Sequence, residues 1–217
     1  MRVVSVNVGL PRTAEWKGES FLTGIFKEPV AGRLPLGEIN IAGDGQADRV
    51  NHGGPGKAVY AYPVEHYPFW YEFLGVDSLP YGALGENLTV EGLDEETTCL
   101  GDVLRVGPVE LVVTQPREPC FKLAAKFGRE DIVRHFLQSG LSGFYLAVRR
   151  TGEVGAGDAI EILSRDPARV PIADVNRAHR GASADSAILR RAAEHDVLPE
   201  YWRKKVRLRL RDRDEPV

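Results

Sequence analysis

Short apolar runs separated by glycine and proline are the feature that most limits the folds open to this chain. Its 217 residues include 23 glycines and 14 prolines, and turn signals of this kind divide the first two-thirds into short segments. Many short strands with frequent turns favour a barrel or a sandwich over an alternating βαβ sheet. Strands are predicted over residues 2–8, 24–27, 33–41, 58–62, 87–90, 103–106, 109–115, 143–149 and 159–163.

Helical patterns interrupt the predicted strands and then replace them. Residues 64–74 and 131–138 repeat their apolar positions with helical spacing. After residue 163 the strand pattern ends. We therefore predict a β domain over 1–166 and a small three-helix domain over 167–217. The three helices are expected at residues 171–179, 184–195 and 199–211.

The composition excludes several classes of protein. The chain is 43% apolar and 27% charged, with a net charge of −3, so nothing in the overall charge indicates nucleic acid or membrane binding. No apolar run is long enough to span a bilayer, and the apolar N-terminus is too short for a signal peptide. The two cysteines, Cys99 and Cys120, are too few for a disulfide scaffold. We expect a cytoplasmic protein with both thiols reduced.

The segment 114–122 places one of these cysteines in a cationic setting. Pro119 suits the first position of a helix, which would put Cys120 in the first turn, where free N–H groups favour a thiolate. Arg117 and Lys122 add positive charge nearby. A thiolate binds metals and attacks electrophiles. The alternative is a buried cysteine acting as a small apolar residue, which is our interpretation of Cys99.

Two other segments contain candidate site residues. In the glycine-rich stretch 43–55, His52 adjoins Gly53 and Gly54, and the N–H groups of such a loop can bind an anion. The alternative is a tight surface loop. Glu86 and Asn87 precede a predicted strand and would place polar groups at a barrel rim, unless they serve only the turn.

The basic segment 201–213 has two possible interpretations. Its arginines and lysines, interleaved with aromatic residues, are compatible with binding nucleic acid phosphates. The commoner arrangement is a helix that packs Trp202, Val206 and Leu210 against the protein while its basic residues face water. We favour the packed helix and do not expect a nucleic acid partner.

Taken together, the motifs at 51–55, 85–88 and 115–120 resemble the MOSC domain family (molybdenum cofactor sulfurase C-terminal domain), in particular bacterial members with a three-helix extension. The resemblance implies a mainly β fold, a closed MOSC-type β-barrel with a few interrupting helices, followed by the three helices. It also implies a molybdenum–molybdopterin cofactor bound by a protein cysteine. Relatives are reductases of N-hydroxylated compounds, including hydroxylaminopurine base analogues, that receive electrons from a partner reductase.

Carried onto this sequence, the resemblance makes Cys120 the molybdenum ligand, and we assign His52 as a candidate proton donor. Two other functions stay open, a sulfur carrier or transferase with a persulfide on Cys120 and a nucleic-acid binding module. The C-terminal helices are expected to be non-catalytic, with a role in docking, in shaping the pocket mouth or in binding the electron donor. The candidate cofactor-binding residues are Asn51, Gly53, Gly54, Glu86, Asn87, Gln115, Arg117 and Lys122.

Overall fold

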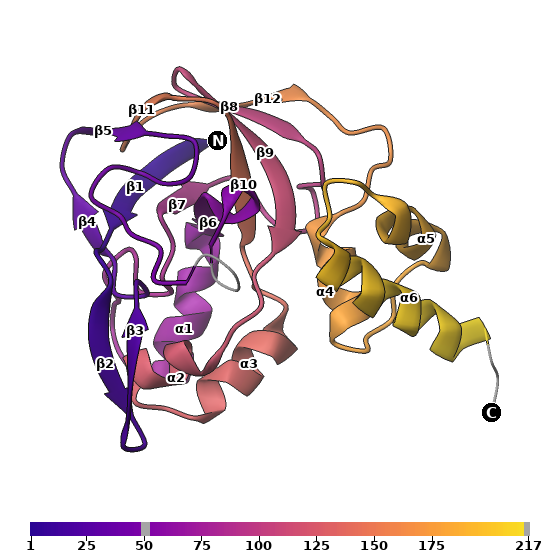
Figure 1. Cartoon of the computed structure of the whole chain (residues 1–217), viewed down its shortest axis with the longest axis horizontal. Coiled ribbons are helices and arrows are strands. Elements are labelled where there is room, and N and C mark those ends of the chain that lie inside the picture. The colour runs from indigo at the N-terminus through magenta and orange to yellow at the C-terminus, as the bar shows by residue number, and fades with distance from the viewer. Residues whose placement is uncertain (49–52, 215–217) are drawn as a thin grey trace.

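A mixed eight-stranded sheet forms the centre of the molecule, in a computed structural model that describes residues 1–48 and 53–214 (Figure 1). The strand order is β12-β8-β9-β10-β6-β7-β1-β4. Every neighbouring pair is antiparallel except β6 and β7, which are parallel. The strands are β1 (Arg2–Val8), β4 (Glu28–Val30), β6 (Val59–Pro63), β7 (Leu88–Glu91), β8 (Val103–Val106), β9 (Val109–Pro116), β10 (Phe144–Arg150) and β12 (Ile160–Ser164).

Two smaller sheets flank the central one. In the first, β5 (Arg33–Leu36) pairs with β11 (Gly152–Gly155), and in the second β2 (Arg12–Trp16) pairs with β3 (Glu19–Thr23). The sequence did not predict β2, β3 or β11, and it placed a strand at 24–27 where the chain is irregular before β4. Most positions of β2 and β3 are exposed or half-buried, so they lack the apolar pattern from which strands were predicted.

The closed barrel expected from the resemblance is not confirmed. Within the described residues the ladder has two ends, at β12 and β4. The start of β1 nevertheless approaches the chain just before β12, where a single antiparallel bridge joins Arg2 to Ala159. The amide of Ile160 also donates to the carbonyl of Met1 at 3.0 Å. The sheet therefore curves until β1 meets the start of β12, without a continuous ladder there.

Helices lie at one end of the sheet and beside it. Figure 1 shows α1 to α3 below the sheet and α4 to α6 grouped together beyond β9. Among the described residues, none of the helices has both the length and the apolar character to cross a membrane. The helical elements are η1 (Pro55–Lys57), η2 (Val64–His66), α1 (Tyr67–Leu74), α2 (Phe121–Phe127), α3 (Asp131–Ser139), α4 (Ile172–His179), α5 (Ser186–Glu194) and α6 (Glu200–Asp214).

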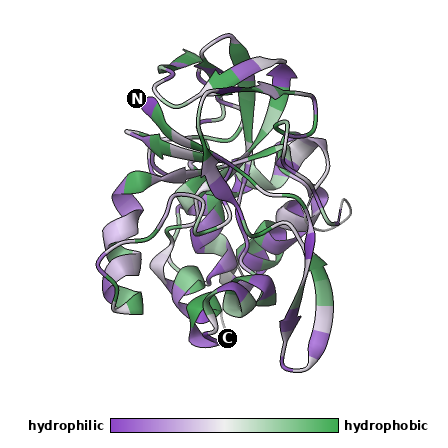
Figure 2. Ribbon diagram, turned by 90° about the vertical axis from the view of Figure 1, so that its left-hand side faces the viewer, coloured by the Kyte–Doolittle hydropathy of each residue, from purple (hydrophilic) through white to green (hydrophobic). Residues whose placement is uncertain are grey.

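The apolar core joins the sheet to the C-terminal helices. Residues of the strands and of α4 to α6 belong to one buried cluster, while α1 to α3 form a second cluster. Figure 2 shows hydrophobic residues in several strands of the central sheet, whereas the helices contain both hydrophobic and hydrophilic residues. Trp202 and Val206 are 2% and 0% exposed, and Leu210 packs against the same cluster. The packed helix predicted over 199–211 is confirmed.

Several basic side chains of α6 pair with other groups of the protein. Lys205 pairs with Glu118, and Arg207 pairs with Glu200 of its own helix. Arg209 donates to the carbonyl of Gly181, while Lys204, Arg207 and Arg211 are exposed. The segment is therefore a packed helix with a partly paired basic face toward water.

Candidate functional site

Strand register brings the candidate site together at one end of the central sheet. Gln115 on β9 lies opposite Tyr145 on β10, and Tyr145 lies opposite Tyr60 on β6. The rings of Tyr60 and Tyr145 are 5.2 Å apart between centroids. The segment that carries Cys120 leaves β9 at this end, so the register fixes where the motif 115–120 begins.

Cys120 occupies the N-cap of α2, with extended backbone angles, and its carbonyl accepts from the amide of Leu123 at 2.9 Å. The expected placement inside the first turn is wrong, because Pro119 lies before the helix and not at its first position. The thiol is still adjacent to the helix start, and it is partly exposed, whereas Cys99 is buried. Neither cysteine forms a disulfide.

Two cavities meet at this cysteine. The larger has a volume of about 690 Å³, within the usual range for small-molecule sites. The smaller has a volume of about 100 Å³, enough for a small polar group only. Lys57, Glu118, Cys120 and Tyr145 line both. The other residues of the larger cavity are Gly53, Gly54, Pro55, Gly56, Gln115, Pro116, Pro119, Pro199, Tyr201 and Trp202.

The smaller cavity is rich in cationic side chains. Lys57, Arg117 and Lys122 all line it. Burial lowers the pKa of Lys57, against the attraction of Glu118, Asp48 and Cys120, which raises it. Positive charge close to a thiol stabilises the thiolate over the thiol. The predicted cationic setting of Cys120 is therefore present, and the structure adds Lys57 to it.

Arg117 is a buried residue that also reaches the cavity wall. It is 7% exposed, and its Nη1 donates to the carbonyl of Leu84 and, at 3.3 Å, to the hydroxyl of Tyr60. Its guanidinium lies 4.9 Å from the ring centroid of Tyr60 and 5.1 Å from that of Phe136. This burial does not fit an exposed ion pair with a surface carboxylate.

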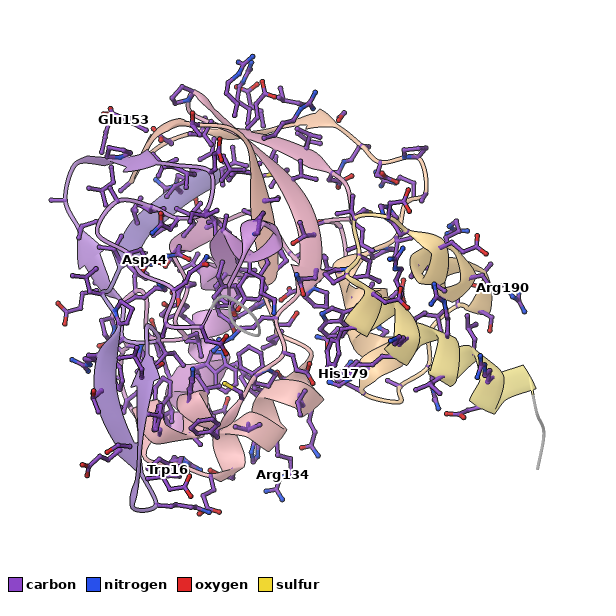
Figure 3. The ribbon with its side chains drawn as sticks, viewed as in Figure 1. Trp16, Asp44, Arg134, Glu153, His179 and Arg190 are labelled. Carbon is purple, nitrogen blue, oxygen red and sulfur yellow. The ribbon has the colours of Figure 1, made fainter. Side chains whose placement is uncertain are left out.

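Asn87 lines the smaller cavity, but its amide group holds the protein together. Its Nδ2 donates to Asp44 at 2.9 Å, and its Oδ1 accepts from the amide of Tyr60 at 3.1 Å. Asp44 in turn forms a buried ion pair with Lys27. Figure 3 shows Asp44 inside the molecule, on the long segment before β6. The structure therefore gives Asn87 a role in building the cavity wall.

Glu86 lies away from both cavities. It is fully buried, and its Oε1 accepts from the hydroxyls of Tyr67 and Thr89 and from the amide of Gly82. Within the part of the chain that the structure describes, its Oε2 has no hydrogen-bond partner. The expectation that Glu86 binds a pterin edge is not met by this arrangement, because the carboxylate anchors the turn that precedes Asn87.

The glycine loop is organised by a neighbouring glutamine. The amide of Gly54 donates to Oε1 of Gln46 at 2.9 Å, so that N–H is not available to bind an anion. A Cβ on Gly53 would lie 2.3 Å from the same Oε1, and Gly54 has a positive φ of 89°. The backbone conformation therefore favours glycine at residue 54, whereas a side chain at residue 53 would require the end of the flexible Gln46 side chain to shift. Asn51 and His52 lie outside the described residues.

The C-terminal helices contact the motif directly. Nε1 of Trp202 donates to Oε1 of Gln115 at 3.0 Å, and Tyr201 and Lys205 donate to Glu118 at 2.8 and 2.7 Å. Partial burial favours a protonated carboxyl, but the hydrogen bonds from α4 and α6 outweigh it and lower the pKa of Glu118 to about 2. The helices thus form part of the wall, in line with the expectation that they shape the pocket mouth.

The side chains around the two cavities fit a metal that is already bound to an organic cofactor, because the protein offers few metal ligands of its own. Over the described ranges 1–48 and 53–214, no group of three or more His, Cys, Asp and Glu side chains is placed to hold a metal ion. One partly exposed thiol beside a ligand-sized cavity and several cationic groups suits a metal–organic cofactor that bears anionic groups. Cys120 would supply the soft ligand, and Lys57 and Arg117 the charge.

Sequence reasoning found part of this site. The structure gathers Cys120, Arg117, Gln115, Lys122, Asn87, Gly53 and Gly54 around the two cavities. It leaves Glu86 outside them. Lys57, Tyr145, Tyr201 and Trp202 were not predicted as site residues. Lys57 follows the glycine loop closely enough to have been considered, but only strand register and helix docking identify the other three.

The family model of the MOSC domain matches residues 48–161, which include Gly53, Gly54, Asn87 and Cys120. The chain belongs to the MOSC domain family. YflK of Bacillus subtilis (strain 168) is 44% identical over 215 residues, covering 99% of this chain and 96% of YflK. YiiM of Escherichia coli (strain K12) is 39% identical over 145 residues, covering 66% of this chain and 65% of YiiM.

A solved MOSC structure extends the similarity to the C-terminal helices. YiiM from Geobacillus stearothermophilus is 34% identical, with a TM-score of 0.79 over 96% of this chain and 98% of that one. A protein named "Reductase" from Gibberella moniliformis is 31% identical over 185 residues, covering 84% of this chain but only 32% of that protein. The fold and the three-helix extension are thus shared with YiiM.

Proposed function

We propose that this MOSC protein is a molybdenum-cofactor-dependent reductase of N-hydroxylated compounds, with Cys120 as the metal ligand. The observation that carries the proposal is the position of the thiol, at the meeting point of two cavities and among cationic side chains. Membership of the MOSC family and the similarity to a protein named "Reductase" support it. Hydroxylaminopurine-type base analogues are the proposed substrates.

The proposed reaction converts an N-hydroxyl group to an amine and water, consuming two electrons and two protons. When bound, the cofactor supplies the electrons and the chemistry that removes oxygen, and a partner reductase reloads it. The chain's own residues bind, orient and deliver protons. Lys57 and Tyr145 line both cavities. Burial lowers the pKa of Lys57, which makes its ammonium group a stronger acid, so Lys57 joins His52 as a candidate proton donor. Burial raises the pKa of Tyr145, so its hydroxyl stays protonated and is assigned to hydrogen bonding only.

The charged side chains have a separate proposed role in binding. Arg117 is placed by Tyr60 and Leu84, and its planar group suits recognition of phosphate or other anions. Lys122 projects from the start of α2 and lines the same cavity. We assign both to cofactor anchoring, together with Gln115.

The direct test is metal and pterin analysis of the full chain made in a host that synthesises the cofactor. We expect molybdenum and pterin to copurify with the wild-type chain and to be absent from Cys120→Ser. Reduction of an N-hydroxylated purine should be measured with a chemical electron donor, which removes the need for the partner. A wild-type chain with no more molybdenum than Cys120→Ser would contradict the proposal.

The second candidate function, a sulfur carrier, relies on the same partly exposed thiol. In that case Cys120 would hold a persulfide. Intact-mass measurement on protein purified without reductant distinguishes the two functions. One added sulfur on Cys120, together with no bound molybdenum, would favour sulfur transfer over reduction.

A further inference from the structure

The residues just before Cys120 are held by the C-terminal helices and not by the sheet alone. Glu118 lies two positions before the cysteine and lines both cavities. Its Oε2 accepts from the hydroxyl of Tyr201 at 2.8 Å, and its Oε1 accepts from Nζ of Lys205 at 2.7 Å. Nε2 of His179 lies 3.2 Å from the same Oε1. Two helices, α4 and α6, therefore meet on one carboxylate.

A second link fixes the other end of this segment. Gln115 is the last residue but one of β9, and its Oε1 accepts from the indole of Trp202 at 3.0 Å. The indole is 2% exposed and packs edge-on against His179, with ring centroids 5.2 Å apart. Figure 3 shows His179 at the boundary between α4 and the rest of the molecule. The segment 115–118 is thus bound at both ends by one helical surface.

The chain between these links has little freedom of its own. Pro116 and Pro119 flank Arg117 and Glu118, and proline fixes φ and restricts the residue before it. Arg117 is held by the carbonyl of Leu84. The position of the Cys120 thiol consequently depends on where the Glu118 carboxylate is held.

We propose that Glu118 is a positioning residue for Cys120, and that α4 and α6 set the position of the thiol through it. The C-terminal helices then act on the site indirectly, through Glu118. His179 and Lys205 themselves line neither of the cavities at the cysteine. The role in catalysis rests on the proposed function of Cys120. The positioning itself is a property of the cofactor-free chain and is tested there.

The competing explanation is that Glu118 acts only through its negative charge beside the thiol. Two substitutions separate the explanations. Glu118→Ala removes a negative charge from the neighbourhood of Cys120, whereas Lys205→Met removes a positive one. A charge effect shifts the thiol's reactivity in opposite directions in the two variants. Loss of positioning shifts it in the same direction, because each variant breaks the same link.

The experiment measures the rate of Cys120 alkylation by iodoacetamide at fixed pH, in the full cofactor-free chain carrying Cys99→Ser. Loss of a link worth one or two kcal/mol changes an opening equilibrium roughly 5- to 30-fold. We expect alkylation to accelerate within that range in both Glu118→Ala and Lys205→Met. The double variant should show no further increase, since coupled residues are not additive. Glu118→Gln, which keeps an acceptor for Tyr201, should recover part of the wild-type rate.

Hydrogen exchange supplies the second measurement. The amides of residues 117, 118 and 120 should exchange faster in both variants, while those of β9 stay protected. The matched control is Glu96→Ala, which breaks the ion pair between Glu96 and Arg177 of α4 without touching the Cys120 segment. Its alkylation rate should equal that of the wild type.

Three outcomes would overturn the proposal: opposite shifts in Glu118→Ala and Lys205→Met, additive effects in the double variant, or an equal acceleration in Glu96→Ala. Thermal unfolding of each variant identifies any that fails to fold. If Glu118→Ala fails, Lys205→Met decides by itself, because loss of a positive charge would slow alkylation and loss of positioning would accelerate it; if Lys205→Met fails, Lys205→Gln takes its place. None of these measurements requires molybdenum. A failure of the reductase proposal therefore leaves this test intact.

Discussion

The chain places its two cysteines in opposite environments, although each follows a strand or turn and has an arginine nearby. Cys99 is 2% exposed, its amide donates to Asp102 at 3.0 Å, and burial raises the pKa of its thiol. Cys120 is partly exposed and lines two cavities. The difference shows that cavity access and the charge facing the sulfur, not the residue type, separate a packed thiol from one that a ligand can reach.

The arginines of the two regions differ in the same way. Arg165 donates to the buried carboxylate of Asp102 at 2.7 Å, so its charge is neutralised beside Cys99. Arg117 donates to a carbonyl and a hydroxyl and faces the cavity of Cys120. Arg165 thus pairs with a buried acid, whereas Arg117 is held by uncharged groups at a cavity wall, where we propose that it binds an anion.

The largest effect is expected from removing each thiol in turn. Cys120→Ser should lose molybdenum retention and hydroxylamine reduction below detection, because the soft ligand is replaced by a weak one. Cys99→Ser should keep both nearly intact, since its sulfur only packs. Metal analysis and a reduction assay with a chemical donor check both variants. Full activity in Cys120→Ser would falsify the assignment of the metal ligand.

The rates at which iodoacetamide modifies Cys120 and Cys99 should differ by orders of magnitude. In the native cofactor-free chain, iodoacetamide should reach Cys120 after no more than a local opening of its segment, whereas Cys99 needs an opening reaction with a free energy near that of unfolding. A stability of about 5 kcal/mol or more makes its alkylation at least ~1,000-fold slower. Peptide mass spectrometry over time measures both rates. Comparable rates under native conditions would show that Cys99 is not protected as the structure has it.

Substitutions of Arg117 and Arg165 should distinguish an effect on cofactor binding from an effect on stability alone. One hydrogen bond to a charged group is worth about 1.5–3 kcal/mol, so Arg117→Ala should weaken cofactor retention by roughly 10- to 150-fold. It should also lower the free energy of unfolding, because the carbonyl of Leu84 loses its partner. Arg117→Lys should recover part of the retention. Molybdenum content and apparent cofactor affinity provide the measurement.

Arg165→Ala is the matched control for this prediction. It leaves the buried Asp102 without its cation and should lower the thermal unfolding midpoint while leaving molybdenum retention in the folded fraction unchanged. Equal loss of cofactor in Arg117→Ala and Arg165→Ala would assign both arginines to stability alone.

The smallest effect concerns alkaline pH. The pKa of Cys99 is raised in the folded state, so above the ordinary thiol pKa of about 8.5 the unfolded chain ionises first. The unfolded state then binds fewer protons than the folded one, and stability falls as pH rises from that value through the folded pKa. Below the ordinary thiol pKa, Cys99 is protonated in both states and its full contribution to stability is present. Denaturant unfolding from pH 7 to 10 should show a shallower decline in Cys99→Ser than in the wild type.

Strand and helix predictions succeeded where one side of an element is buried. The strands at 2–8 and 103–106 are placed as predicted, and so are the C-terminal helices within a few residues. The hairpin of β2 and β3 was not predicted because its side chains are mostly exposed. Helix start signals were less reliable, since Pro119 precedes α2 instead of opening it. The division at residues 166 and 167 stays a prediction.

The family motifs, the cationic segment around Cys120 and the packed face of the last helix could all be predicted from the sequence. These are local properties, set by neighbouring residues and by helical spacing. The role of Glu86 and the participation of Tyr145 and Trp202 were decided only by the tertiary structure. Whether a polar side chain faces a cavity or a buried turn depends on strand register and on which helix docks against it. Those contacts join residues far apart in the chain, so they cannot be predicted from the local sequence.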